Sequence, residues 1–219
     1  MSSEWLAWQI VDSAFPTGAF AHSWGLESAW QHGEVPDAPA LESMLRDVLQ
    51  QVAYGSLPLV TAAHRHPERL EPLDQLADAF LTNIVSNRAS RVQGRALVAT
   101  AARIWPSPST TALASRAAGL HAHAAPLTGA TFRTIGLALP VTQRIALFGA
   151  ARGVLAAAVR LGIAGSYEAQ RMQSNCAPWL DDLLVRCGHL DEHDIAQTAP
   201  VLDMLQAAHD RLYSRLFQS

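Results

Sequence analysis

The stretch DSAFPTGAFAHSWGLE, residues 12–27, interrupts a helical pattern close to the start of the chain. Within it, Phe15-Pro16-Thr17-Gly18 breaks the helix, because proline lacks an amide donor and glycine accepts turn conformations. The aromatic, small and polar residues that follow are dense for a simple connector. We therefore predict a corner to which later helices dock.

Helical periodicity surrounds this corner on both sides. A short first helix is expected over residues 4–14, with Trp5, Ile10 and Ala14 facing inward, and a second over residues 22–30, closed by Gly33. Apolar residues at helical spacing extend the pattern to the end of the chain. The further helices are expected at 41–52, 73–85, 87–105, 111–121, 141–161, 167–173, 179–186 and 200–216.

Several residues have a positional meaning within these helices. Asp37 is a candidate N-cap with Pro39 in the first turn, and a serine in the loop 106–109 is a second capping residue. Gly94 lies mid-helix at a cost of about 1 kcal/mol relative to alanine, which indicates that something approaches closely there. Gly149 and Gly153, one turn apart, predict close approach of another helix backbone.

No segment alternates with the period of a strand. The chain has 219 residues, enough for one substantial core, and shows no linker or repeat. The sequence therefore predicts an all-α fold: a single domain, residues 1–219, built as a helical bundle of about ten helices.

The composition favours a subunit that buries part of its own surface against partner proteins. Hydrophobic residues make up 49% and charged residues only 16%, against a usual charged share of roughly 25%. All 16 basic residues are arginine, and the net charge of −3 gives no electrostatic support for nucleic-acid binding. No apolar run is long enough to cross a membrane. We expect a cytoplasmic protein with Cys176 and Cys187 reduced.

Candidate chemistry is sparse. His64 and His66, and likewise His121 and His123, are two residues apart, so helical geometry would point each pair to different faces. No carboxylate or cysteine near them in sequence completes a metal set. No catalytic triad, nucleotide-binding phosphate loop or cofactor motif is found, so catalytic, cofactor and metal residues are all predicted as none.

Arginines and the end of the chain are more informative. Arg88, Arg91 and Arg95 share one helix face, and Arg152 lies in an otherwise apolar helix, where it must be paired or reach an interface. Residues 209–217, HDRLYSRLF, stay apolar and basic almost to the last residue, whereas chain ends are usually polar and frayed. This tail is expected either to fold back on the core or to be ordered by a partner.

Four separated segments resemble the UreF family of urease accessory proteins. They are residues 12–27, NRASRVQG at 87–94, AAAVRLGIAGSYEAQ at 156–170 and HDRLYSRLFQS at 209–219, in the family's order. Trp24 replaces the phenylalanine or tyrosine that is frequent in the family, and residues 105–130 show no match.

The resemblance implies a non-enzymatic, dimeric, all-helical protein that acts in urease maturation. Its partners would be UreD (also called UreH), the GTPase UreG and apo-urease, and the assembly would insert nickel. An arginine acting on the GTPase is conceivable, with Arg91, Arg144, Arg152 or Arg160 as candidates. The full predicted set of partner-binding residues is Phe20, His22, Ser23, Glu27, Arg91, Arg144, Arg152, Arg160, His209, Arg215, Leu216 and Phe217.

Two other classes of function stay open. The chain could be a nickel carrier that binds the metal through its histidine pairs. An α-helical enzyme would need a buried cluster of carboxylates or histidines, and no predicted helix carries one on its apolar face.

Overall fold

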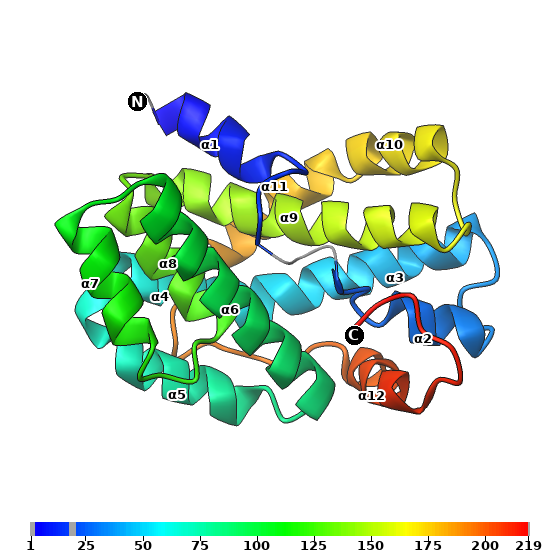
Figure 1. Ribbon diagram of the computed structural model, residues 1–219. Helices are drawn as coiled ribbons and strands as arrows, with labels where there is room; N and C mark the ends of the chain where they lie inside the picture. Colours follow the sequence, from blue (N-terminus) through cyan, green and yellow to red (C-terminus); the bar gives the residue numbers. More distant parts are fainter. Residues whose placement is uncertain (1–2, 18–20, 219) are drawn as a thin grey trace.

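The computed structural model describes residues 3–17 and 21–218, which form helices and no strand (Figure 1), so the predicted all-α fold is confirmed. The α-helices are α1 (Ser3–Val11), α2 (Leu26–Gln31), α3 (Ala38–Gln51), α4 (Leu57–Arg65), α5 (Leu70–Phe80), α6 (Ile84–Ile104), α7 (Pro108–Ala117), α8 (Ala124–Thr134), α9 (Leu139–Arg160), α10 (Ser166–Asn175), α11 (Ala177–Cys187) and α12 (Pro200–Ala208). Shorter helical segments are the π-helix η2 (Val52–Ser56) and the 3-10 helices η3 (Pro67–Arg69) and η4 (His209–Arg211). In the described part of the chain, no helix combines the length and apolarity that crossing a membrane requires.

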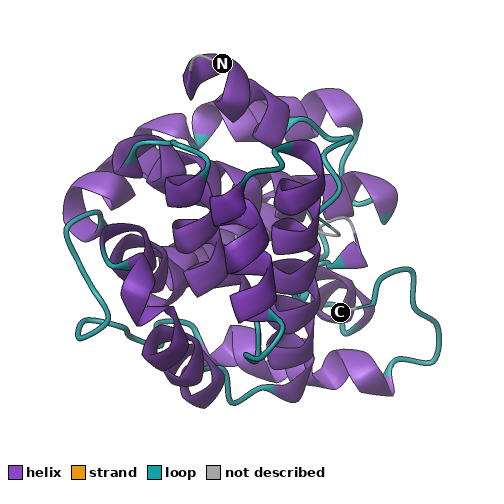
Figure 2. Ribbon diagram, turned by 60° about the vertical axis from the view of Figure 1, so that its left-hand side comes forward, coloured by secondary structure: helices purple, strands orange, loops and turns teal. Residues whose placement is uncertain are grey.

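Helix α9 runs through the middle of the molecule (Figure 1), and Figure 2 shows the described residues as helices joined by loops. Helix α9 contacts α1, α2, α3, α4, α8, α10 and α11. Pro140 lies in its first turn, where a helix needs no amide from proline. The apolar surface of α9 packs with α3 and α11 in the largest hydrophobic cluster, which includes Leu49, Leu147 and Leu183. This helix is therefore the axis on which the other helices are placed.

The interrupting stretch is a corner, as expected. Phe15 is buried and stacks on Trp105 with ring centroids 5.7 Å apart, and the Thr100 hydroxyl donates to the Pro16 carbonyl at 2.8 Å. Helix α2 starts later than predicted, because Trp24 and Gly25 have φ of 59° and 83°, outside the right-handed helical region. Gly18, Ala19 and Phe20 lie outside the described residues.

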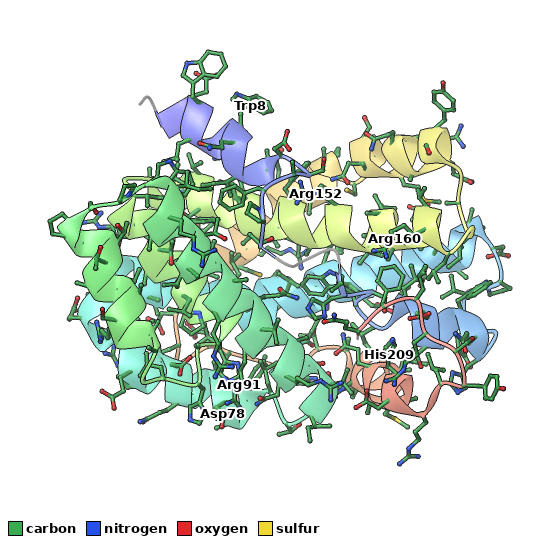
Figure 3. The ribbon with its side chains drawn as sticks, in the orientation of Figure 1. Trp8, Asp78, Arg91, Arg152, Arg160 and His209 are labelled. Atoms are coloured by element: carbon green, nitrogen blue, oxygen red, sulfur yellow. The ribbon has the colours of Figure 1, made fainter. Side chains whose placement is uncertain are left out.

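Helix α1 confirms the predicted inward position of Ile10 and corrects those of Trp5 and Ala14. Leu6 and Ile10 are buried against the corner, whereas Trp5 and Trp8 are exposed and Ala14 lies beyond the helix end. Trp8 points away from the body at the top of Figure 3. The orientation of a nine-residue helix that is apolar on both sides is decided by packing, not by its pattern.

Some predicted boundaries were wrong for identifiable reasons. The expected helix 73–85 is two elements, because α5 ends at Phe80 and the Asn83 side chain caps α6 by accepting from Val85 N. The expected helix 111–121 is α7, which already ends at Ala117, and α8 follows with Pro126 in its first turn. The last helix ends at Ala208, not at residue 216. The cap at Asp37 is confirmed, and of the two serines in the loop 106–109 it is Ser107 that caps α7.

The predictions for the glycines are likewise confirmed at one position and wrong at others. A Cβ at Gly94 would overlap the Ala122 carbonyl oxygen and lie 2.9 Å from the His123 carbonyl carbon, so the predicted close approach is confirmed. Gly153 makes room for the Trp24 indole instead of a helix, and no described atom lies within 4 Å of a Cβ at Gly149. The close helix contact is instead at Gly129, where α8 lies on the backbone of α4.

Candidate partner-binding site

The end of the chain folds back on the body of the protein. After η4, residues 212–218 run beside α2 to a point near the middle of the molecule (Figure 1). The Gln218 amide donates to the Ala21 carbonyl at 2.7 Å, and the Gln31 side-chain amide donates to the Ser214 carbonyl at 3.0 Å. Of the two alternatives for the tail, folding back on the core is the one observed.

One carboxylate holds this tail. The Oε1 atom of Glu27 accepts from Leu216 N at 2.6 Å, and Oε2 accepts from Phe217 N at 3.1 Å and from His209 Nε2 at 3.0 Å. We call these four residues the Glu27 clamp. They come from both ends of the sequence, and their hydrogen bonds join α2 to the tail.

Burial makes the clamp strong. Glu27 is 2% exposed and the His209 side chain is fully buried. A buried carboxylate without donors would cost several kcal/mol, and hydrogen bonds to a charged group contribute about 1.5–3 kcal/mol each. Undocking the tail would therefore leave Glu27 without two of these three donors, which favours the docked tail.

Aromatic and ionic contacts surround the clamp. Phe217 is 6% exposed. The Arg160 guanidinium lies 4.2 Å from its ring centroid, a cation–π contact that attracts the positive charge to the ring. Asp210 accepts from Arg88 through both carboxylate oxygens, at 2.9 and 3.2 Å, and from Arg215 at 3.1 Å. These exposed pairs add little energy singly, but they fix the tail to α6.

The docked tail presents apolar and basic side chains to solvent. Tyr213 is fully exposed, Leu216 is 53% exposed, and Arg215 is also exposed. Leu216 is exposed while its neighbour Phe217 is buried, although the backbone amides of both donate to Glu27. The clamp thus orders a surface that is not itself covered in this structure.

His22 and Ser23 lie buried near the clamp, on the loop before α2. Burial lowers the pKa of His22 to about 4, with smaller contributions from the charges of Arg88 and His209. The Ser23 hydroxyl accepts from Glu27 N at 3.4 Å at the start of the helix. Both side chains are buried in this conformation, and their partner-binding role stays a prediction.

The predicted arginines lie at separate places (Figure 3). Arg160 meets the clamp, whereas Arg144 is exposed on α9. Arg152 is paired as expected: it donates to the Val11 carbonyl, and burial lowers its pKa while the charge of Asp12 opposes that shift. Arg91 contacts the turn before α8. Phe20 lies outside the described residues, and its role stays a prediction.

Histidines of the two pairs are used differently. The buried His64 ring bonds to the Leu137 carbonyl at 2.8 Å, and His66 lies beside Glu68 on the surface. His121 and His123 lie in an extended turn and both approach Asp78, at 3.7 and 3.0 Å. Within residues 3–17 and 21–218, no three His, Cys, Asp or Glu side chains are grouped to hold a metal ion.

Sequence reasoning missed the acidic partners in these networks. The sequence pattern does not single out Asp74, Asp78 or Asp210. Asp78 lies four residues after Asp74 on α5, so both face the same neighbours. That spacing only weakly indicates a site, because Asp74 and Asp78 bond to Ala122 and His123, which are more than 40 residues away in sequence.

The exposed segment that the clamp orders carries tyrosine and arginine, residue types that are enriched in protein interfaces. The chain belongs to the UreF family, since the family model UreF matches residues 35–177. It is 37% identical over 222 residues to urease accessory protein F of Arabidopsis thaliana, covering 99% of this chain and 92% of that protein.

Relatives from other organisms agree. Urease accessory protein F of Oryza sativa subsp. japonica is 36% identical over 223 residues, covering 98% of this chain and 85% of that protein. Urease accessory protein UreF of Roseobacter denitrificans is 28% identical over 213 residues, covering 96% and 91%. The earlier resemblance is confirmed, and an accessory role in urease maturation is supported.

Proposed function

We propose that this protein is a non-enzymatic scaffold that acts with UreD (UreH) and the GTPase UreG on apo-urease. The assembly promotes GTP-dependent insertion of nickel into the urease metallocentre. The protein acts in the cytoplasm as a homodimer of one-domain subunits. The family assignment supports the accessory role. The exposed side chains of the tail support the proposal that the protein acts by binding other proteins.

The observation that carries the proposal is the tail ordered by the Glu27 clamp. Ordering a side chain on binding costs about 0.5–1.5 kcal/mol, so a surface that is ordered beforehand binds more tightly. Tyr213 and Arg215 belong to residue types that are enriched in protein interfaces, and Leu216 adds apolar area. We assign this exposed face of the tail to UreD.

An arginine that acts on the partner GTPase must reach beyond the protein surface. Among the four candidates, Arg91 and Arg152 donate to backbone carbonyls and Arg160 lies on the Phe217 ring. Arg144 is exposed near the start of α9. We therefore favour Arg144 for this role.

Co-expression with UreD, UreG and apo-urease, followed by size-exclusion chromatography and a urease activation assay with GTP, tests the proposal. Tyr213→Ala combined with Leu216→Ala should abolish co-elution with UreD and lower urease activation, with no change in helicity. Tyr167→Ala, at an equally exposed tyrosine on α10, is the matched control and should co-elute normally. Normal co-elution of the tail variant would refute the assignment.

The alternative function, nickel carriage by the histidine pairs, has its own test. Equilibrium dialysis with nickel should show no stoichiometric tight site if the protein is a scaffold. A tight site lost in His121→Ala would instead favour the carrier.

A further inference from the structure

Two arginines of α6 share a single backbone acceptor. Arg91 Nε donates to the His121 carbonyl oxygen at 3.2 Å, and Arg95 Nη2 donates to the same oxygen at 3.4 Å. Among residues 3–17 and 21–218, no carboxylate lies within ion-pair distance of either guanidinium. A neutral carbonyl satisfies one donor of each but compensates neither charge.

The turn that carries this carbonyl is held rigidly. Ala122 has φ of 70°, a left-handed conformation that costs a non-glycine residue roughly 1–2 kcal/mol. The buried Asp74 accepts from Ala122 N at 3.1 Å and from His123 N at 2.7 Å. Gly94 lies directly beneath, where any side chain would overlap the turn. Such strain persists only when its surroundings impose it, and it is concentrated at functional sites.

A second network fixes the other side of the turn. The Ser90 hydroxyl accepts from Ala124 N at 3.0 Å and bonds to His123 Nδ1 at 3.1 Å. The other ring nitrogen of His123 therefore donates to Asp78, which also accepts from Asn87. The hydrogen bond from Asn87, and to a lesser degree the one from His123, holds the pKa of Asp78 below its usual range. Asp78 is thus bonded to Asn87 and His123 and is not the counter-ion of Arg91 or Arg95.

Charge along α6 points the same way. The helix contains four arginines and no acidic residue, in a chain whose net charge is −3. Arg88 is neutralised by Asp210. Arg91 and Arg95 remain as adjacent cations, and a guanidinium fork matches the oxygen pair of a carboxylate.

We propose that Arg91 and Arg95, presented on the His121 carbonyl, form a docking site for a carboxylate-rich segment of a partner protein. This inference rests on the proposed scaffold function and names the chemistry of a second contact surface, separate from the tail. Neither arginine lines the cleft of about 310 Å³ to which α3, α6 and α9 contribute, so the site is separate from that cleft. Val92, which follows Arg91 on α6 and is 44% exposed, adds an apolar side chain beside the pair, which suits a protein partner.

Fluorescence anisotropy with labelled hexaglutamate tests the proposal on the full chain. Arg91→Gln with Arg95→Gln should weaken binding by about tenfold, because both charge-assisted contacts are lost. The matched control, Arg103→Gln with Arg171→Gln, removes two exposed arginines and should change binding less than about twofold. Equal weakening in both double variants would show general charge attraction and overturn the site.

Two further measurements keep the result interpretable. If the double glutamine variant melts at lower temperature, Arg95→Gln alone should still weaken binding about threefold, since Arg95 is exposed and its bond is the longer one. Inorganic phosphate at constant ionic strength should displace hexaglutamate no better than chloride. Selective displacement by phosphate would overturn the protein carboxylate assignment.

The assay contains neither UreD nor UreG, so its failure leaves the tail proposal untouched. The tail variant Tyr213→Ala with Leu216→Ala should bind hexaglutamate as the unchanged protein does. Loss of hexaglutamate binding in that variant would place the acidic ligand on the tail and refute the Arg91 and Arg95 site.

Discussion

Glu27→Gln tests the clamp most sharply, because it changes one charged group at nearly constant shape. The carboxylate accepts from three donors, and two of them, Phe217 N and His209 Nε2, bond to the same oxygen. An amide has one acceptor oxygen and a donor nitrogen. Whichever way the amide is oriented, at least one tail N–H then faces another donor.

The expected loss follows from those bonds. Hydrogen bonds to a charged group contribute about 1.5–3 kcal/mol each, so losing one and weakening the others should cost the docked tail about 2–4 kcal/mol. Hydrogen exchange reports such local opening directly. At 1.4 kcal/mol per factor of ten, the Leu216 and Phe217 amides should exchange about 30-fold to 1,000-fold faster.

Glu34→Gln is the control, since Glu34 is exposed and close in sequence. Its exchange rates at Leu216 and Phe217 should equal those of the unchanged protein. If Glu27→Gln leaves those two amides equally protected, the carboxylate does not hold the tail. If all amides of the protein lose protection together, Glu27 stabilises the core and the clamp is wrong.

Three further changes have expected outcomes. Gly94→Ala should lower the free energy of unfolding by about 1–3 kcal/mol through overlap with the turn, whereas Gly149→Ala should be neutral or stabilising by urea denaturation. The pKa of His22 in the folded protein, about 4, is below the ordinary value of 6.5, so the unfolded chain binds the proton at a higher pH than the folded protein does. The free energy of unfolding should therefore fall as the pH drops from about 6.5 to 4. It should fall less in His22→Gln. Phe217→Ala should speed exchange in the tail while shifting the urea midpoint less than Gly94→Ala, because the tail opens alone.

Local chemistry made the helical fold readable from the sequence. Apolar periodicity placed α3 and α9, and side-chain caps at Asp37 and Ser107 marked helix starts, because each depends on residues a few positions apart. Boundaries failed where the deciding contact was long-range or conformational. The start of α2 depends on the left-handed Trp24, which no propensity would indicate.

The candidate site was foreseen only in part. Glu27 and the tail were both singled out, but their contact joins residues about 190 positions apart, and no pattern reports such a distance. Gly94 did signal the turn that lies on it, since a mid-helix glycine indicates close approach. What approached, a strained turn held by Asp74, required the structure.

The most direct test of the central claim is the affinity of purified UreD for the unchanged protein and for Tyr213→Ala with Leu216→Ala. If the clamped tail is the UreD surface, the double variant should bind about 100-fold more weakly or not at all, as expected for loss of central interface side chains, while Tyr167→Ala binds normally. Equal affinity of UreD for all three proteins would contradict the account.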